Sequence, residues 1–230
     1  MSLYMSLLVF SAIIPCLLSF DKKVRFYRIW KALFPSILIV GSIYITADIF
    51  FVKHGIWGFN ASYHSGIIFA GLPLEEWLFF IVIPYACVFI HYVVVYYFPN
   101  LVAGNLFIRI FSIILILLLI TVVVLNNEKT YTSFNFVLLV LVLIFALFDK
   151  SGLLKRYVFS FLFMLIPFFI VNSILTGTFI PGEVVWYNNE EILGIRVLTV
   201  PIEDIGYAFS LILMNLLFIN RFQKLSNFRK

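Results

Sequence analysis

Residues 71–80 read GLPLEEWLFF and place the adjacent carboxylates of Glu75 and Glu76 at the start of a long apolar run. The pattern recurs at 201–204, PIED, ahead of the last apolar run of the chain. A proline that can occupy the first helical position is a common helix start, and the free N–H groups of a first turn favour negative charge. This helix-start chemistry would explain one copy. Two copies indicate acid chemistry inside a membrane, where carboxylates are costly.

The composition predicts an integral membrane protein. Of the 230 residues, 63% are hydrophobic and 12% are charged, whereas soluble domains average about 45–50% apolar and about 25% charged residues. The chain has seven apolar stretches close to the ~20 residues that a membrane-spanning helix needs: 3–20, 33–52, 73–97, 106–125, 132–148, 157–176 and 201–220. We therefore expect an all-α fold with seven transmembrane helices.

The basic residues predict the orientation of these helices. The connection after the first span is rich in lysine and arginine, which by the positive-inside rule places it in the cytoplasm and the N-terminus outside. Seven crossings then put the C-terminus in the cytoplasm, with these basic residues inside: Lys22, Lys23, Arg25, Arg28, Lys31, Arg109, Lys150, Lys155, Arg156, Arg221, Lys224, Arg229 and Lys230. Only Lys53, Lys129 and Arg196 fall outside. This asymmetry explains the net charge of +5 without a nucleic-acid partner, and we expect a multi-pass protein of the cell (plasma or inner) membrane.

The chain contains an internal repeat. One constant shift of the sequence along itself aligns identical residues around the two acidic segments: Asn60 with Asn188, Gly66 with Gly194, Ile67 with Ile195, Pro73 with Pro201 and Glu75 with Glu203. One joining helix adds a crossing, so both halves enter the membrane in the same direction, which is a parallel repeat. We expect a first three-helix repeat at 1–98, a linking helix at 99–130 and a second three-helix repeat at 131–230.

The four acids of the repeated segments are candidate catalytic residues: Glu75, Glu76, Glu203 and Asp204. Neighbouring helical residues point about 100° apart, so one member of each pair can face the bundle and the other a supporting partner. An apolar site favours the neutral acid, which can donate a proton, while a better hydrated neighbour stays ionised and can accept one. Such a pair suits a reaction that protonates a carbon–carbon double bond and then removes a different proton, as in the cyclisation of a polyene.

Aromatic and amide side chains near these acids are candidates for substrate binding. Aromatic faces stabilise a cation by about 0.5–2 kcal/mol each, although an aromatic belt at the membrane interface explains any one of them as well. The asparagines could orient a carboxyl group or cap a loop, and an acid inside an apolar span is a functional candidate by default. The candidates are Trp57, Phe59, Asn60, Trp77, Trp186, Tyr187, Asn188, Tyr207 and Asp48.

The sequence lacks the motifs that are typical of several cofactors, metals and substrates. The sequence has no glycine-rich dinucleotide or nucleotide-phosphate loop, and its two cysteines and three histidines lack metal-ligand spacing. The last span carries no lysine between Pro201 and Asn220 for a retinal Schiff base, and aspartate-rich diphosphate-binding motifs are missing. We therefore expect no cofactor and no metal.

Residues 71–85, with VWYN at 185–188 and PIED at 201–204, resemble the membrane-integral, heterodimer-type lycopene cyclases. The two halves of that family occur as separate subunits or fused in one chain, and this sequence resembles the fused form. The resemblance implies an isomerase (an intramolecular lyase) that takes lycopene from the bilayer and cyclises its ends without redox change. It also implies Glu75 and Glu203 as leading acids, with Glu76 and Asp204 as partners or bases.

The alternative is a non-enzymatic membrane protein, either a transporter or a lipid- or carotenoid-binding protein, whose acids couple protons or orient helices. Carriers usually contain helices interrupted near mid-membrane. Here the polar groups gather at the outer helix ends, which favours the cyclase.

Overall fold

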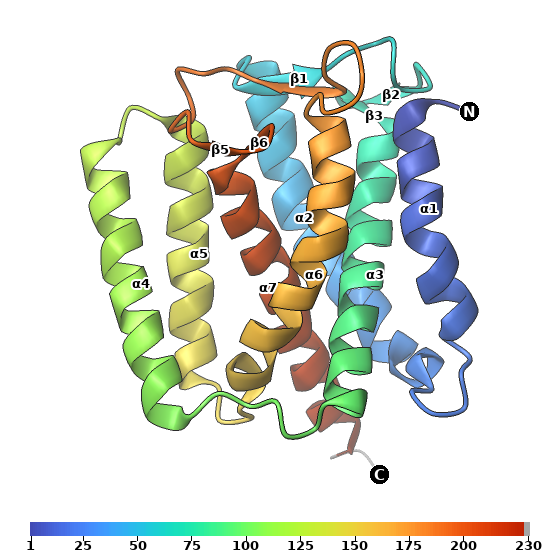
Figure 1. The fold of residues 1–230 in the computed structure, drawn as a ribbon, viewed down its shortest axis with the longest axis vertical. Helices are drawn as coiled ribbons and strands as arrows, with labels where there is room; N and C mark the ends of the chain where they lie inside the picture. Colours follow the sequence, from blue (N-terminus) through green and yellow to red (C-terminus); the bar gives the residue numbers. More distant parts are fainter. Residues whose placement is uncertain (228–230) are drawn as a thin grey trace.

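The computed structural model describes residues 1–227, so Arg229, Lys230 and the end of the second expected repeat lie outside the described residues. The described chain is mostly helical and folds into an up-and-down bundle (Figure 1). Its helices are α1 (Leu3–Leu18), α2 (Trp30–Lys53), α3 (Leu74–Tyr97), α4 (Asn105–Leu125), α5 (Thr130–Phe148), α6 (Leu153–Leu175) and α7 (Ile202–Asn227), with a short 3-10 turn at Phe26–Ile29.

The predicted helical fold is confirmed, with differences at the helix ends. Six helices are long and apolar enough to cross a membrane, whereas α1 is shorter: its 16 residues span about 24 Å against the ~30 Å of a bilayer core. Helix α6 begins at Leu153, ahead of its predicted start at 157, and includes Lys155 and Arg156. A span predicted from apolar residues alone stops short of these two basic residues. Their backbone is nevertheless helical, because long basic side chains can extend to the membrane interface.

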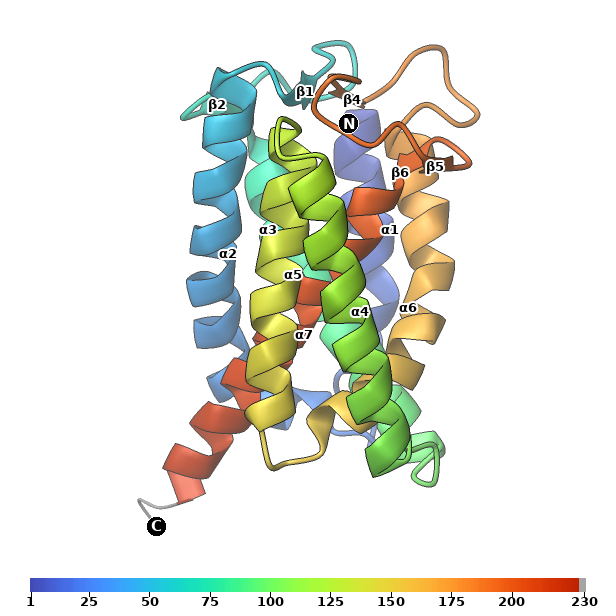
Figure 2. The same ribbon diagram turned by 90° about the vertical axis from the view of Figure 1, so that its left-hand side faces the viewer.

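The loops separate into two groups at opposite ends of the bundle. The N-terminus, the strands and the α4–α5 connection lie at one end, and the C-terminal end of α7 lies at the other (Figures 1 and 2). The connections α1–α2, α3–α4 and α5–α6 share the end that holds the C-terminal part of α7. This grouping brings the basic segments around Lys22, Lys150 and Lys224 to one end of the molecule.

Three two-stranded ribbons, which the sequence does not predict, cover the opposite end. Strand β1 (Trp57–Phe59) pairs with β4 (Val185–Tyr187), β2 (Ile68–Phe69) with β3 (Leu72–Pro73), and β5 (Arg196–Val197) with β6 (Val200–Pro201). Strands of two or three residues are too short to produce a periodic pattern.

The ribbon of β1 and β4 connects loops that lie far apart in the sequence. Gly58 is opposite Trp186 at the centre of its antiparallel register. A Cβ atom at Gly58 would lie 2.6 Å from the indole ring of Trp186, so the close approach of the two strands requires glycine.

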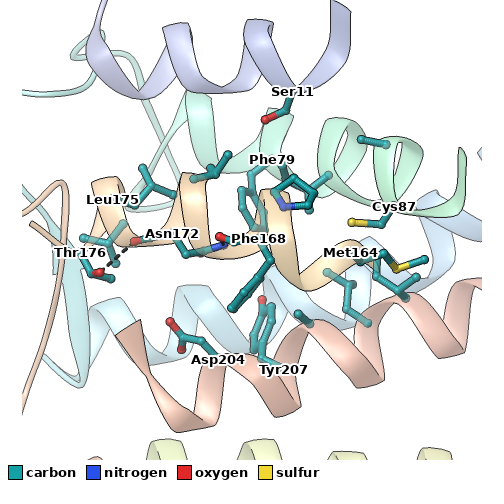
Figure 3. Close-up of a pocket in the computed structure, with 18 of the residues that line it drawn as sticks. Ser11, Phe79, Cys87, Met164, Phe168, Asn172, Leu175, Thr176, Asp204 and Tyr207 are labelled. Atoms are coloured by element: carbon teal, nitrogen blue, oxygen red, sulfur yellow. Dashed lines mark hydrogen bonds between the residues drawn. The ribbon is translucent and has the colours of Figure 1, made fainter. Parts of the chain in front are cut away.

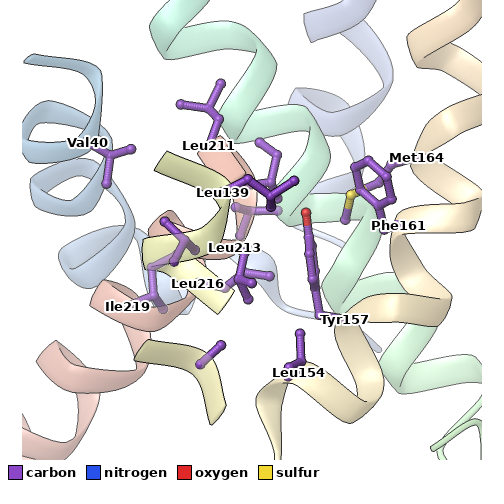
Figure 4. Close-up of a cluster of buried hydrophobic side chains, with 14 of the residues drawn as sticks. Val40, Leu139, Leu154, Tyr157, Phe161, Met164, Leu211, Leu213, Leu216 and Ile219 are labelled. Atoms are coloured by element: carbon purple, nitrogen blue, oxygen red, sulfur yellow. The ribbon is translucent and has the colours of Figure 1, made fainter. Parts of the chain in front are cut away.

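Helices α3 and α7 occupy the interior of the bundle. Helix α3 packs against α1, α2 and α6, and α7 packs against α2, α5 and α3, while α4 lies outside α5 (Figure 2). A dense apolar core fills the half nearer the C-terminus, where Tyr157 lies among leucines of α5 and α7 such as Leu139 and Leu213 (Figure 4). In lipid such a core is stabilised by close packing rather than by exclusion of water, and some of its residues, such as Phe161 and Met164, also line the cavity described below.

Candidate active site

The two acidic segments are positioned by hairpins that lead directly into helices. Leu74 N–H donates to the Ile67 carbonyl (2.8 Å), and Ile202 N–H donates to the Ile195 carbonyl (3.0 Å). The acids lie in the first turns of α3 and α7, as predicted. Pro73, in contrast, is extended and caps α3 from outside, because it also ends strand β3.

The first acid of each pair binds the loop above its helix. Glu75 accepts hydrogen bonds from the Ser2 hydroxyl (2.7 Å) and from both the N–H (2.7 Å) and the hydroxyl (3.1 Å) of Ser65. Glu203 accepts from the Thr132 hydroxyl (2.7 Å) and from the Leu193 N–H (2.6 Å). Both side chains are fully buried, and neither lines the cavity described below.

The second acid of each pair points into the bundle and is held by tyrosines. Tyr4 donates to Glu76 Oε2 at 2.6 Å. Asp204 accepts two hydrogen bonds, from Tyr131 to Oδ1 (2.7 Å) and from Tyr187 to Oδ2 (2.9 Å). Burial, followed by the nearby charge of Asp204, raises the pKa of Tyr187 well above its ordinary value, so this phenol remains a hydrogen-bond donor.

A third carboxyl group comes from α2. Asp48 is 1% exposed, and its Oδ2 accepts a hydrogen bond of 3.2 Å from Tyr207. Its Oδ1 has no hydrogen-bond partner among residues 1–227. Buried polar atoms are nearly always paired, so this oxygen sets Asp48 apart from Asp204, both of whose oxygens accept a hydrogen bond.

These three carboxyl groups line one cavity of about 310 Å³. Strands β1 and β4 contribute Trp57, Val185 and Tyr187 to its wall, and most of the remaining wall is apolar. Figure 3 shows Asp204 and Tyr207 extending from α7 into the space that Phe168 of α6 also enters. The acidic segments of the two halves therefore contribute to one shared cavity rather than to one cavity each.

The other predicted substrate-binding residues divide between the cavity and the loops around it. Asp48, Trp57, Tyr187 and Tyr207 line the cavity. The remaining residues do not: Phe59, Asn60, Trp77, Trp186 and Asn188.

Those five residues support the loops. Phe59 packs edge-on against Trp57, with ring centroids 5.0 Å apart, and Trp77 donates to the Phe69 carbonyl at 3.3 Å. The Trp186 ring covers Gly58. The side-chain oxygens of both asparagines accept backbone N–H groups two residues further on, at 3.0 Å each, which is the loop-capping arrangement.

Tyr4 and Tyr131, which bind the inward acids, are not among the site residues predicted from the sequence. Each is the second residue of its helix, α1 or α5. The shift that aligns Glu75 with Glu203 aligns Tyr4 with Thr132 and hides the match, whereas a shift shorter by one position aligns the two tyrosines. A repeated tyrosine at the start of each half was therefore the available signal.

Within residues 1–227, no group of three or more His, Cys, Asp or Glu side chains is arranged to hold a metal ion. The buried His91 forms a hydrogen bond with Ser160 (2.6 Å) and lies outside this cavity.

Long apolar helices around a buried, carboxyl-lined cavity define a multi-pass membrane protein. The family model described as lycopene cyclase matches residues 1–94 and 128–222, and each matched segment contains one acidic motif. The chain belongs to the lycopene cyclase family. Neither the curated proteins nor the solved structures contain a match to it. Family membership supports a carotenoid cyclase activity in general, with a carotenoid as substrate.

Proposed function

We propose that this protein cyclises the linear ends of lycopene by a proton-initiated, cofactor-independent isomerisation inside the shared cavity. The observation that carries the proposal is the convergence of Asp48, Glu76 and Asp204 on one buried, largely apolar space. Such a space can hold a hydrocarbon next to acids while it excludes water, which would otherwise trap a cationic intermediate.

The reaction balances with the protein's own groups. A neutral carboxylic acid gives its proton to the terminal double bond, which leaves a tertiary carbocation. The next double bond attacks this centre and closes the ring, which moves the charge to a ring carbon. A carboxylate then removes a proton from a neighbouring carbon, and the released electron pair forms the new double bond. One proton enters and one leaves, so the product is an isomer and no oxidant is needed. Return of a proton from the acceptor carboxyl group to the donor carboxylate then restores the starting state of the protein.

Hydrogen bonding distinguishes the acid from the base. Asp204 accepts a tyrosine hydroxyl on each oxygen, and bonds donated to a carboxylate stabilise its ionised form. Asp48 has one long bond and one unpartnered oxygen, an environment in which a charge is costly. We assign Asp48 as the proton donor and Asp204 as the proton acceptor, with Glu76 as the carboxylate that stabilises the cation from the α3 side.

Aromatic faces complete the proposed site. Trp57, Phe79, Tyr187 and Tyr207 line the cavity together with the carboxyl groups. Each face can contribute about 0.5–2 kcal/mol to a desolvated cation, which favours the charged intermediate over the neutral substrate.

The contacts of Glu75 and Glu203 suggest positioning rather than proton transfer. Each binds a loop that lies above its helix, through Ser65 or Leu193. By fixing the first turn, each directs the next acid, Glu76 or Asp204, into the cavity. This assignment differs from the resemblance, which implies Glu75 and Glu203 as the leading acids.

We also infer that residues 1–98 and 131–230 are parallel three-helix repeats joined by 99–130, which gives seven spans with α1 included. Ser65 and Leu193 are equivalent under the repeat alignment and make the same bond to an acid. The β1–β4 register is symmetric about Gly58 and Trp186, which are equivalent under the same alignment. The clustered basic loops support a cytoplasmic C-terminus, an outside N-terminus and location in the plasma or inner membrane.

Expression in a host that accumulates lycopene tests the proposal. The wild-type protein should produce carotenoids with rings, whereas Asp204→Asn should leave lycopene unchanged at equal protein level. Glu190→Gln is the matched control, because Glu190 is an exposed loop acid. Rings that persist when Asp48, Glu76 and Asp204 are all amides would exclude the carboxyl mechanism. Unchanged lycopene with wild-type protein, together with substrate-dependent proton flux in vesicles, would instead support a transporter.

A further inference from the structure

The cavity does not end at the carboxyl groups but continues as an apolar arm along α3. Ile83, Cys87 and Ile90 recur every three or four residues on α3 and line this arm, as expected for one face of a helix. Helix α6 contributes Met164 and Phe168 to the arm. Figure 3 places Cys87 and Met164 at the end away from Asp204.

The arm is open toward lipid on one side. Helices α1 and α6 both pack against α3, but they do not pack extensively against each other in the described chain. Phe10 and Ile14 of α1 line the cavity although they are 71% and 63% exposed. Side chains that are both exposed and cavity-lining mark an opening, and this one lies between α1 and α6.

The length of the arm is comparable with that of a lipid-soluble chain. From Glu76 to Ile90, α3 rises by about 21 Å at 1.5 Å per residue, which is about two thirds of the ~30 Å bilayer core. Along this length the lining side chains carry few polar atoms, and the Ser11 hydroxyl and the Asn172 amide are already bonded within their own helices, to the Leu7 and Phe168 carbonyls.

We propose that a polyene groove, lined by Phe10, Ile14, Cys87, Met164 and Phe168, binds the linear chain next to the reacting end, and that the chain enters sideways from the bilayer between α1 and α6. The identity of the occupant as a carotenoid rests on the proposed function. A linear polyene fits because the groove is apolar, elongated and continuous with the carboxyl-lined end. The remainder of the chain stays in lipid, so the protein handles one end of the carotenoid at a time.

Tryptophan substitutions test the groove. Ile14→Trp places an indole at the opening, on a residue exposed enough to accept it without repacking of the core. Leu17→Trp is the matched control, because Leu17 lies on the same helix, is 72% exposed and does not line the cavity. Cys87→Trp fills the arm from α3, and the thermal unfolding temperature of each purified variant identifies any that misfolds.

Binding and turnover are measured separately. In an Asp204→Asn background, which should block turnover, the lycopene retained by purified protein is read from its visible absorbance. Ile14→Trp should lower the retained lycopene about tenfold, equivalent to about 1.4 kcal/mol, and should lower ring formation in the active background. Leu17→Trp should change neither quantity.

The outcomes separate the two proposals. If the wild-type protein forms no rings but Ile14→Trp still lowers lycopene retention, the groove assignment is supported and the proposed cyclase function is refuted. If rings form and Ile14→Trp behaves like Leu17→Trp in both measurements, the groove assignment is overturned. It is also overturned if Ile14→Trp reduces the phospholipid that copurifies while lycopene retention stays constant, since the groove would then hold an acyl chain.

Discussion

The two tyrosine hydroxyls on Asp204 offer the sharpest test of how the proposed base is held. Tyr131 and Tyr187 donate to different oxygens, at 2.7 and 2.9 Å, and phenylalanine at either position removes only the hydroxyl. Without both donors, a carboxylate in this buried site has no hydrogen-bond donor left among the contacts that the structure describes. A reaction that needs the ionised form should then slow in proportion to the free energy lost.

The magnitude follows from the bonds removed. A hydrogen bond to a charged group contributes about 1.5–3 kcal/mol, and each 1.36 kcal/mol in the barrier is about tenfold in rate. Tyr131→Phe or Tyr187→Phe alone should therefore slow cyclisation by about 10- to 100-fold. The double variant should slow it by up to about 10⁴-fold, an upper limit because neighbouring groups are not additive.

The assay is the initial rate of ring formation from lycopene in proteoliposomes, with products separated by chromatography. Tyr157→Phe is the matched control: it removes a buried hydroxyl that donates to the Phe209 carbonyl (2.8 Å), and Tyr157 does not line the cavity. This control should lose stability without a comparable loss of rate. A folded double variant that cyclises lycopene at the wild-type rate would refute the assignment of Asp204 as an ionised base.

Substitutions at Asp48, Glu75 and Gly58 probe separate parts of the structure. Asp48→Asn should abolish cyclisation while Asp48→Glu retains part of it, measured by pigment analysis; full activity in Asp48→Asn would remove Asp48 as the proton donor. Glu75→Gln should lower the free energy of unfolding by about 1–2 kcal/mol through weaker bonds to Ser65, yet leave the folded fraction active, and complete inactivity at normal stability would favour a catalytic Glu75. Gly58→Ala should lower the unfolding free energy by about 1–3 kcal/mol through overpacking against Trp186. Gly104→Ala, with no atom within 4 Å of an added Cβ, should unfold closer to the wild-type temperature, because it loses only the preference of a helix N-cap for glycine over alanine.

The sequence was sufficient for the helices and for the placement of the acids, because both are local signals. Apolar runs identify helices whatever their neighbours, and Glu75 and Glu76 lie in the first turn of α3 as the motif indicates. The direction in which each acid points depends on more distant contacts. Tyr4 is 72 residues from Glu76, and Tyr131 is 73 residues from Asp204, so helix packing decides which member of each pair enters the cavity.

The two halves differ at equivalent positions around the carboxyl groups of the cavity. Under the repeat alignment, Asp48 corresponds to Thr176, and the hydroxyls of Tyr187 and Tyr207 have no counterpart on Phe59 and Phe79. Identical halves would place like carboxyl groups in like surroundings, whereas different surroundings separate the proton affinities of two carboxyl groups and thereby their roles as acid and base. The second half supplies the additional donors to Asp204 and the only described hydrogen bond to Asp48. We infer that a duplicated scaffold whose halves diverged at these positions provides one site with a distinct proton donor and proton acceptor.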